Sequence, residues 1–140
     1  MVIAVSACLL GENCKYNGGN NRDEAVLEYV KGHTVVPVCP EVMGGLPVPR
    51  VPSEICGDEV INREGVSVDM QFRAGAQKAL ELVMESGAEL VVLQSRSPSC
   101  GAEYIYDGSF SGRTVPGKGI FARLLEENGI ALLDASKLHK

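Results

Sequence analysis

Three apolar runs in this chain of 140 residues each arrive at a cysteine. Residues 2–7 lead into Cys8, residues 34–38 lead into Cys39, and residues 89–93 are followed, after a Ser-, Arg- and Pro-containing segment, by Cys100. Short apolar runs rich in β-branched residues predict buried strands. The carboxyl ends of parallel strands share one edge, and open α/β sheets bind their ligands along that edge. We therefore expect three thiols, far apart in sequence, to meet in one crevice.

The segments between these runs predict an alternation of strands and helices. Residues 70–86 carry apolar side chains at three- and four-residue spacing and predict the longest helix. Shorter helices are expected over residues 23–31 and 118–128, and a last strand over residues 130–133. This alternation requires a parallel sheet with right-handed crossovers. The expected fold is a single α/β domain over residues 1–140, a three-layer sandwich with a mostly parallel, Rossmann-like sheet.

The remaining segments are expected to be irregular or to form an excursion from the sheet. Residues 40–53 hold four prolines, which exclude a helix or a central strand and suit a pocket wall. A β-hairpin excursion is expected within residues 55–68, with residues 59–61 pairing with residues 66–68. Residues 101–116 are expected to be a loop and residues 134–140 a frayed tail. Asn20 or Asn21 is the expected cap of the first helix, and Asp69 that of the second.

Composition narrows the possible partners and the compartment. The net charge of −5 argues against capture of a nucleic-acid backbone, which favours a basic face. No apolar run approaches the ~20 residues that a membrane helix needs, and the N-terminal run is expected to be a strand and not a signal peptide. Five cysteines are an odd number and fit a reducing cytoplasm, where thiols serve metals or catalysis. We expect a cytoplasmic protein, without membrane contact, that is a monomer or homodimer.

Three thiolates can hold more than one kind of inorganic group. Iron–sulfur clusters usually take four cysteines, so three would leave one iron open. Catalytic zinc also keeps an open position beside three protein ligands. Soft thiolates fit both, although the absence of His from these loops weakens the case for zinc. The residues alone therefore leave the metal undecided.

Other polar residues near the expected edge are candidates for a role in the chemistry. Glu41 follows Cys39 and Pro40 directly, which suits a general base. Ser97 and Ser99 flank Pro98 and are placed to hydrogen-bond cluster sulfurs or a ligand, or simply to form a turn.

The remaining cysteines and cations are interpreted more simply. Cys14 is expected to be an exposed loop cysteine, with a fourth ligand or a resolving thiol as alternatives, and Cys56 is interpreted as structural. One of Arg22, Arg50 and Arg96 could hold an anionic or carbonyl oxygen. Residues 117–119 could offer backbone N–H groups to an anion, although their spacing fits no known phosphate motif.

Several blocks of the sequence together resemble the domain-of-unknown-function 523 family, which includes the thiouracil desulfidases. The blocks are residues 6–11, 16–19, 37–42, 45–50 and 95–101, and they span nearly the whole chain. The resemblance implies a [4Fe–4S] cluster held by Cys8, Cys39 and Cys100, with the fourth iron left for the sulfur of the substrate. Related domains fused to a second domain remove sulfur from thiolated uridine in tRNA. The lack of that second domain argues against a tRNA substrate here.

The resulting prediction is a non-redox iron–sulfur desulfidase acting on a small thiolated nucleobase or nucleoside, of the thiouracil type. Hydrolysis of the C–S bond would use Glu41 as base, with Ser97 and Ser99 beside the cluster. The alternative is a non-catalytic iron–sulfur, metal-binding or redox-sensing module. A metal-free enzyme with a cysteine nucleophile is a further alternative, but no cysteine has an obvious His partner.

Overall fold

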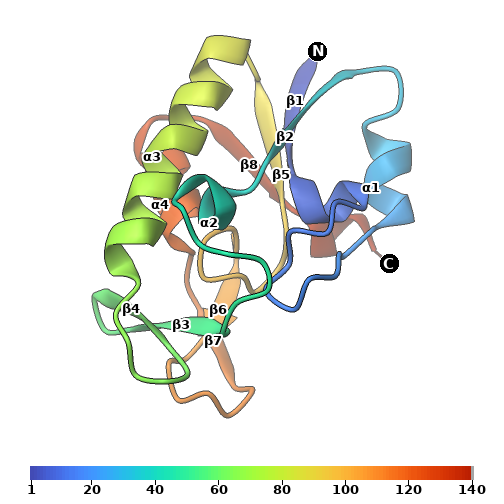
Figure 1. The fold of residues 1–140 in the computed structure, drawn as a ribbon. Helices are drawn as coiled ribbons and strands as arrows, with labels where there is room; N and C mark the ends of the chain where they lie inside the picture. Colours follow the sequence, from blue (N-terminus) through green and yellow to red (C-terminus); the bar gives the residue numbers. More distant parts are fainter. Residues whose placement is uncertain (140) are drawn as a thin grey trace.

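A four-stranded parallel sheet forms the centre of the computed structural model, which describes residues 1–139. The strands are β1 (Val2–Ser6), β2 (Thr34–Val38), β5 (Leu90–Leu93) and β8 (Ala131–Asp134), in the spatial order β2–β1–β5–β8. Every neighbouring pair is parallel (Figure 1). The predicted parallel sheet is confirmed, and the strands that lead to the three cysteines are neighbours in it.

Helices cover both faces of this sheet. The helices α2 (Pro40–Met43), α3 (Asp69–Ser86) and α4 (Ile120–Glu127) lie on one face, and α1 (Glu24–Tyr29) lies on the other (Figure 1). Along β1, Ala4 packs into the first layer, whereas Ile3 and Val5 pack into the second. This alternation is the period of two that a strand buried on both faces requires. The three-layer α/β sandwich is therefore confirmed. None of the helices in residues 1–139 combines the length and apolar character that crossing a membrane requires.

Two antiparallel hairpins extend from the sandwich. The first pairs β3 (Ser53–Cys56) with β4 (Glu59–Asn62), and the second pairs β6 (Tyr104–Tyr106) with β7 (Thr114–Pro116). The predicted excursion is present, and residues 66–68 pair antiparallel with β4 as expected, through the Ile61–Ser67 bridge and two backbone hydrogen bonds of 2.9 Å. The pairing of β4 with β3 on its other side was not expected. The positive φ of 66° at Gly57 permits the tight turn between β3 and β4. The expected loop over residues 101–116 likewise contains the second hairpin.

The helix caps differ from those expected. Asp23, and neither Asn20 nor Asn21, caps α1 by accepting hydrogen bonds from two backbone N–H groups. Asp69 lies inside the first turn of α3 and accepts a hydrogen bond from the Val60 backbone N–H at 3.0 Å. Its carboxylate therefore ties α3 to the hairpin instead of capping the helix.

A buried carboxylate fixes the segment that begins at Asp134, so the expected frayed tail over residues 134–140 was wrong for residues 134–139. Residue 140 lies outside the described residues. Asp134 is 3% exposed and accepts hydrogen bonds from Ser95 Oγ at 2.6 Å, the Ser136 N–H at 2.9 Å and the Ala102 N–H at 3.2 Å. Burial alone would raise the pKa of Asp134, but these hydrogen bonds lower it below its ordinary value. The 3-10 helix η2 (Ala135–Leu138) follows, and Ala135 is buried.

The helix α2 packs directly on α3 through two glycines. A Cβ at Gly75 would lie 1.8 Å from the Pro40 carbonyl oxygen, and one at Gly44 would lie 1.9 Å from the Gln71 carbonyl oxygen. The expectation that residues 40–53 exclude a helix was wrong for one turn, because Pro40 sits at the first helical position, where its missing N–H costs nothing. This close packing fixes the position of the segment that carries Cys39 and Glu41.

We predict that Gly75→Ala destabilises the protein. An alanine normally stabilises a helix interior by about 1 kcal/mol relative to glycine, but overpacking here is expected to lower the free energy of unfolding by about 1–3 kcal/mol. Urea denaturation measures this change, with Lys78→Ala on the exposed face of α3 as the matched control. A Gly75→Ala variant as stable as that control would contradict the close approach of α2 and α3.

Candidate functional site

Three cysteines lie just beyond the carboxyl ends of adjacent strands. Cys8 lies in the 3-10 helix η1 (Ala7–Leu10) directly after β1, and Cys39 is the N-cap of α2 directly after β2. Cys100 lies in the turn between β5 and β6. Because β1 lies between β2 and β5, Cys8 is central, and it is close enough for electrostatic interaction with both Cys39 and Cys100. The structure thus brings the three predicted residues to one edge.

A fourth thiol, that of Cys14, joins this group, and the expectation that it is an exposed loop cysteine was wrong. Cys14 is half-buried, and its thiol is near enough to those of Cys39 and Cys8 to shift their pKa values. Its backbone carbonyl accepts a hydrogen bond from Arg50 Nη2 at 3.0 Å, which draws the loop onto the site. Sequence spacing gave no signal of this contact, because it depends on an arginine 36 residues away.

The Cys14 contacts favour negative charge on the two neighbouring thiols. The contact with Cys14 lowers the pKa of Cys8, and a similar contact lowers the pKa of Cys39 to about 7. These contacts with Cys39 and Cys8 raise the pKa of Cys14 itself far above its ordinary value. The Cys14 thiol therefore favours the thiolate forms of Cys8 and Cys39, and thiolates are the form that binds soft metals.

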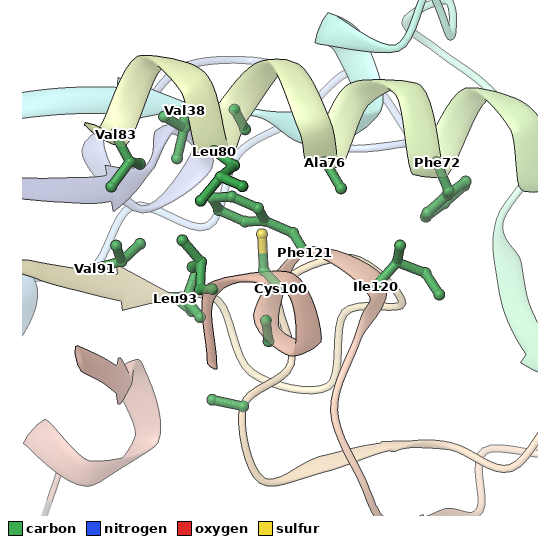
Figure 2. Packing of buried hydrophobic residues seen from close by; sticks show 14 of the residues in the cluster. Val38, Phe72, Ala76, Leu80, Val83, Val91, Leu93, Cys100, Ile120 and Phe121 are labelled. Carbon is green, nitrogen blue, oxygen red and sulfur yellow. The ribbon is translucent and has the colours of Figure 1, made fainter. Parts of the chain in front are cut away.

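Cys100 lies in a different environment from Cys8 and Cys39. It is 4% exposed and packs in the apolar cluster beneath α3, among side chains that include Leu80 and Phe121 (Figure 2). Burial raises the pKa of Cys100, while the hydroxyls of Ser6 and Ser99, the latter 3.6 Å from Cys100 Sγ, act in the opposite direction. The apolar surroundings thus favour the protonated thiol of Cys100 over the thiolate.

Hydrogen bonds from its own side chains and from the start of α4 stabilise the turn that carries Cys100. Ser97 Oγ accepts hydrogen bonds from the Cys100 N–H at 3.0 Å and the Ser99 N–H at 3.2 Å. The first N–H groups of α4 donate to the carbonyls of Pro98 and Ser99. The expectation that residues 117–119 offer N–H groups to an anion is not met at this helix start, because the turn takes up its donors. The N-terminus of α4 thereby positions the residues before Cys100.

Glu41 is held between a cation and a hydroxyl. Its Oε1 accepts from Arg50 Nε at 3.1 Å, and its Oε2 accepts from Ser99 Oγ at 2.8 Å. The side chains of Arg50 and Glu41 are only 8% and 16% exposed. Ser97 Oγ lies 3.0 Å from Ser99 Oγ and extends this network. Of the three candidate cations, Arg50 is the one that holds the carboxylate of Glu41, and it also donates to the Pro47 carbonyl.

The other singled-out residues have local roles. Arg22 makes an exposed ion pair with Glu24 at 2.9 Å. Cys56 Sγ lies 3.4 Å from the Gly108 carbonyl, which links the first hairpin to the loop of the second. Asn21 was considered only as a helix cap, but its side chain donates to Cys8 Sγ at 3.5 Å. A polar residue that follows a glycine-rich loop was the only signal for this contact.

The residues present fit an iron–sulfur group by the chemistry of their donors. Cys8, Cys39 and Cys100 are free cysteines, and thiolates are the soft ligands that such clusters take. Within residues 1–139, no group of three or more His, Cys, Asp or Glu side chains is arranged to hold a metal ion.

A cavity of about 470 Å³ opens beside this edge. It is lined by residues 20–23, residues 94–96 and three residues near the chain end. Asn21 belongs to its wall and also contacts Cys8 Sγ, so one residue links the cavity to the thiols. Arg96 also lines the cavity and has a positive φ of 60°, a conformation that is uncommon for a residue other than glycine.

Comparisons with known proteins agree on one family. The family model described as 2-thiouracil desulfurase matches residues 3–137. The chain is 35% identical to the uncharacterized protein YbbK of Bacillus subtilis (strain 168), over 99% of this chain and 98% of YbbK. The structure of the present chain is similar to that of the [4Fe–4S]-dependent thiouracil desulfidase TudS, with a TM-score of 0.90 and 38% sequence identity. The match covers 97% of this chain and 91% of TudS.

We predict that Arg50→Lys destabilises the protein even without any bound group. Lysine cannot reproduce the fork that joins Glu41 to two backbone carbonyls, so the free energy of unfolding should fall by about 2 kcal/mol. Arg22→Lys is the matched control, since the exposed pair with Glu24 is worth less than about 1 kcal/mol. Equal effects of the two substitutions in urea denaturation would contradict the buried role of Arg50.

Proposed function

This chain belongs to the 2-thiouracil desulfurase family, and we propose that it hydrolyses the C–S bond of a small thiolated pyrimidine. The observation that carries the proposal is the presence of three cysteines and a half-buried, ion-paired carboxylate in the segments that follow β1, β2 and β5. The overall reaction exchanges the thiocarbonyl sulfur for the oxygen of water and releases hydrosulfide. The similarity to TudS supports a [4Fe–4S] cluster as the cofactor.

Cys8, Cys39 and Cys100 would hold the cluster. With three protein ligands, the cluster supplies an open iron that acts as a Lewis acid toward the sulfur of the substrate. The chain prepares its ligands in two ways. Cys14 favours the thiolates of Cys8 and Cys39, and the hydroxyls of Ser6 and Ser99 contact the sulfur of Cys100.

Glu41 is the proposed general base. A carboxylate offers about four lone-pair positions on its two oxygens. Arg50 occupies positions on Oε1, while Ser99 occupies only one on Oε2. Oε2 therefore keeps a free lone pair that can take a proton from the attacking water. The fixed position of Glu41 at the start of α2 places this oxygen beside the thiols.

Ser97 and Ser99 orient this base. Ser99 has one hydroxyl proton, and its contact with Glu41 Oε2 at 2.8 Å is much shorter than that with Cys100 Sγ at 3.6 Å. Ser99 therefore donates to the carboxylate and accepts from Ser97 at 3.0 Å. The two hydroxyls point their protons toward Glu41, which stabilises its ionised form.

A thiolated nucleobase or nucleoside is the proposed substrate class. The cavity beside Asn21 has room for a single ring system, and its wall offers amide, hydroxyl and guanidinium groups for hydrogen bonds. The net charge of −5 argues against a nucleic-acid substrate, whose backbone is captured by a basic surface. A monomer or homodimer in the cytoplasm remains our proposal for the state of the protein.

The rival function is a non-catalytic iron–sulfur or redox-sensing module. Such a module requires thiolate ligands but no proton acceptor beside them. The chain instead buries Arg50 at 8% exposure to hold Glu41 next to the thiols. Burying a charged pair has a desolvation cost, and that cost is understandable where the carboxylate takes part in the reaction.

We predict that protein reconstituted with iron and sulfide without oxygen converts thiouracil to uracil. Glu41→Gln should keep the cluster absorbance and lower the turnover rate at least about 100-fold, because the amide cannot accept the proton. Glu64→Gln, in the exposed turn that follows β4, is the control. Full cluster occupancy without uracil formation by the unmodified chain would rule out this substrate.

We also predict that Cys100→Ser abolishes cluster binding, since the buried position leaves no other thiol to replace it. Iron and acid-labile sulfide bound after reconstitution measure this loss. Cys56→Ser is the matched control, because Cys56 bonds to the Gly108 carbonyl and not to the site. Equal iron retention in both variants would show that Cys100 is not a ligand.

A further inference from the structure

One carboxylate, that of Asp134, contacts both ends of the segment that carries Cys100. Asp134 is the last residue of β8, and the parallel pairing of β8 with β5 places it beside the start of this segment. Its Oδ1 accepts a hydrogen bond from Ser95 Oγ at 2.6 Å, and its Oδ2 accepts one from the Ala102 N–H at 3.2 Å. The carboxylate therefore joins the two ends of residues 95–102.

The same carboxylate also contacts the 3-10 helix η2. Ser136 donates to Asp134 Oδ1 through its backbone N–H at 2.9 Å and through its Oγ at 2.7 Å. All of the partners of Asp134 described here are donors, which an ionised carboxylate accepts and which an asparagine amide could accept only in part. This buried group therefore has two candidate roles, as a cap for η2 or as a link across the segment of Cys100.

The linked segment contains the groups that contact the proposed base. Within it, Ser97 Oγ accepts a hydrogen bond from the Cys100 N–H at 3.0 Å, and Ser99 Oγ donates to Glu41 Oε2 at 2.8 Å. The hydrogen bonds of Asp134 go to the two ends of the segment and to η2. Any influence of this carboxylate on Cys100 therefore passes through the backbone.

We propose that Asp134 is a positioning residue for the site, because it fixes the backbone that presents Ser99 and Cys100. A segment whose ends are joined has less conformational freedom to lose when its side chains bind a ligand, so binding is tighter. Groups that orient metal ligands without touching the metal commonly contribute roughly 10–100-fold to metal affinity. The effect on cluster binding rests on the proposed function, whereas the effect on the segment rests only on these hydrogen bonds.

Two substitutions that each remove one hydroxyl from Asp134 Oδ1 separate the two roles. Ser95→Ala breaks the link and leaves the contacts with η2, whereas Ser136→Ala weakens those contacts and leaves the link. These variants are preferred to Asp134→Asn, which would bury an amide among donors and could prevent folding.

Hydrogen exchange of the cluster-free, full-length chain tests the link directly. We expect Ser95→Ala to speed exchange over residues 97–102 by about fivefold, as the loss of one hydrogen bond of ordinary strength implies. Ser136→Ala should speed exchange only over residues 135–139. Equal protection of residues 97–102 in the two variants would overturn the proposal.

The bound cluster gives a readout that a general loss of stability would not produce. After reconstitution with iron and sulfide, Ser95→Ala should release iron to a chelator about 10-fold faster than the unmodified chain, and the visible circular dichroism of the cluster should change. Ser136→Ala should match the unmodified chain in both measurements. Equal iron release from the two variants would overturn the proposal.

The two measurements also separate this inference from the proposed function. A chain that shows the expected exchange pattern but binds no cluster or never turns over thiouracil would contradict the proposed function and leave the role of Asp134 standing. An active chain with equal exchange in both variants would do the reverse.

Discussion

The parallel pairing of β1 with both β2 and β5 is the constraint on which the site depends. In the register of this sheet Ser6 lies opposite Val38, so Cys8 and Cys39 follow at nearly the same level. The pairing of Val5 with Val92 brings the segment after β5 to the same edge. Each side chain at this edge is separated from the others by dozens of residues of sequence. Backbone hydrogen bonds of the sheet therefore set the spacing of the thiols before any metal binds.

A second layer of polar contacts converts this edge into a chemically specific site. The close contact of α2 with α3 at Gly44 and Gly75 fixes the position of the backbone that carries Glu41. Arg50 and Ser99 hold the two carboxylate oxygens of Glu41. Buried charged groups are costly unless they are paired and hydrogen-bonded, and this pair satisfies both conditions. The same arginine anchors the Cys14 loop. The guanidinium of Arg50 thus connects Glu41, the backbone at Cys14 and the backbone at Pro47.

The sequence predicted the sheet and the placement of Cys8, Cys39 and Cys100, because apolar runs and strand ends are local signals. The grouping of Glu41 with Ser97 and Ser99 also followed from their nearness to those cysteines. The pairing of β3 with β4, the one-turn helix at Pro40 and the position of Cys14 did not follow. Each of these depends on a contact between distant segments, such as Gly44 with Gln71 or Arg50 with Cys14. Local residue patterns do not indicate which distant segments come into contact.

The central claim is that three cysteines of this chain hold one cluster and leave one iron for the substrate. Mössbauer spectroscopy of protein reconstituted with iron-57 tests it directly, before and after addition of thiouracil. The account predicts that about one quarter of the iron absorption changes on addition, because one of four iron sites lacks a protein ligand. A spectrum in which no iron responds, or in which the protein holds no cluster at all, would contradict the account.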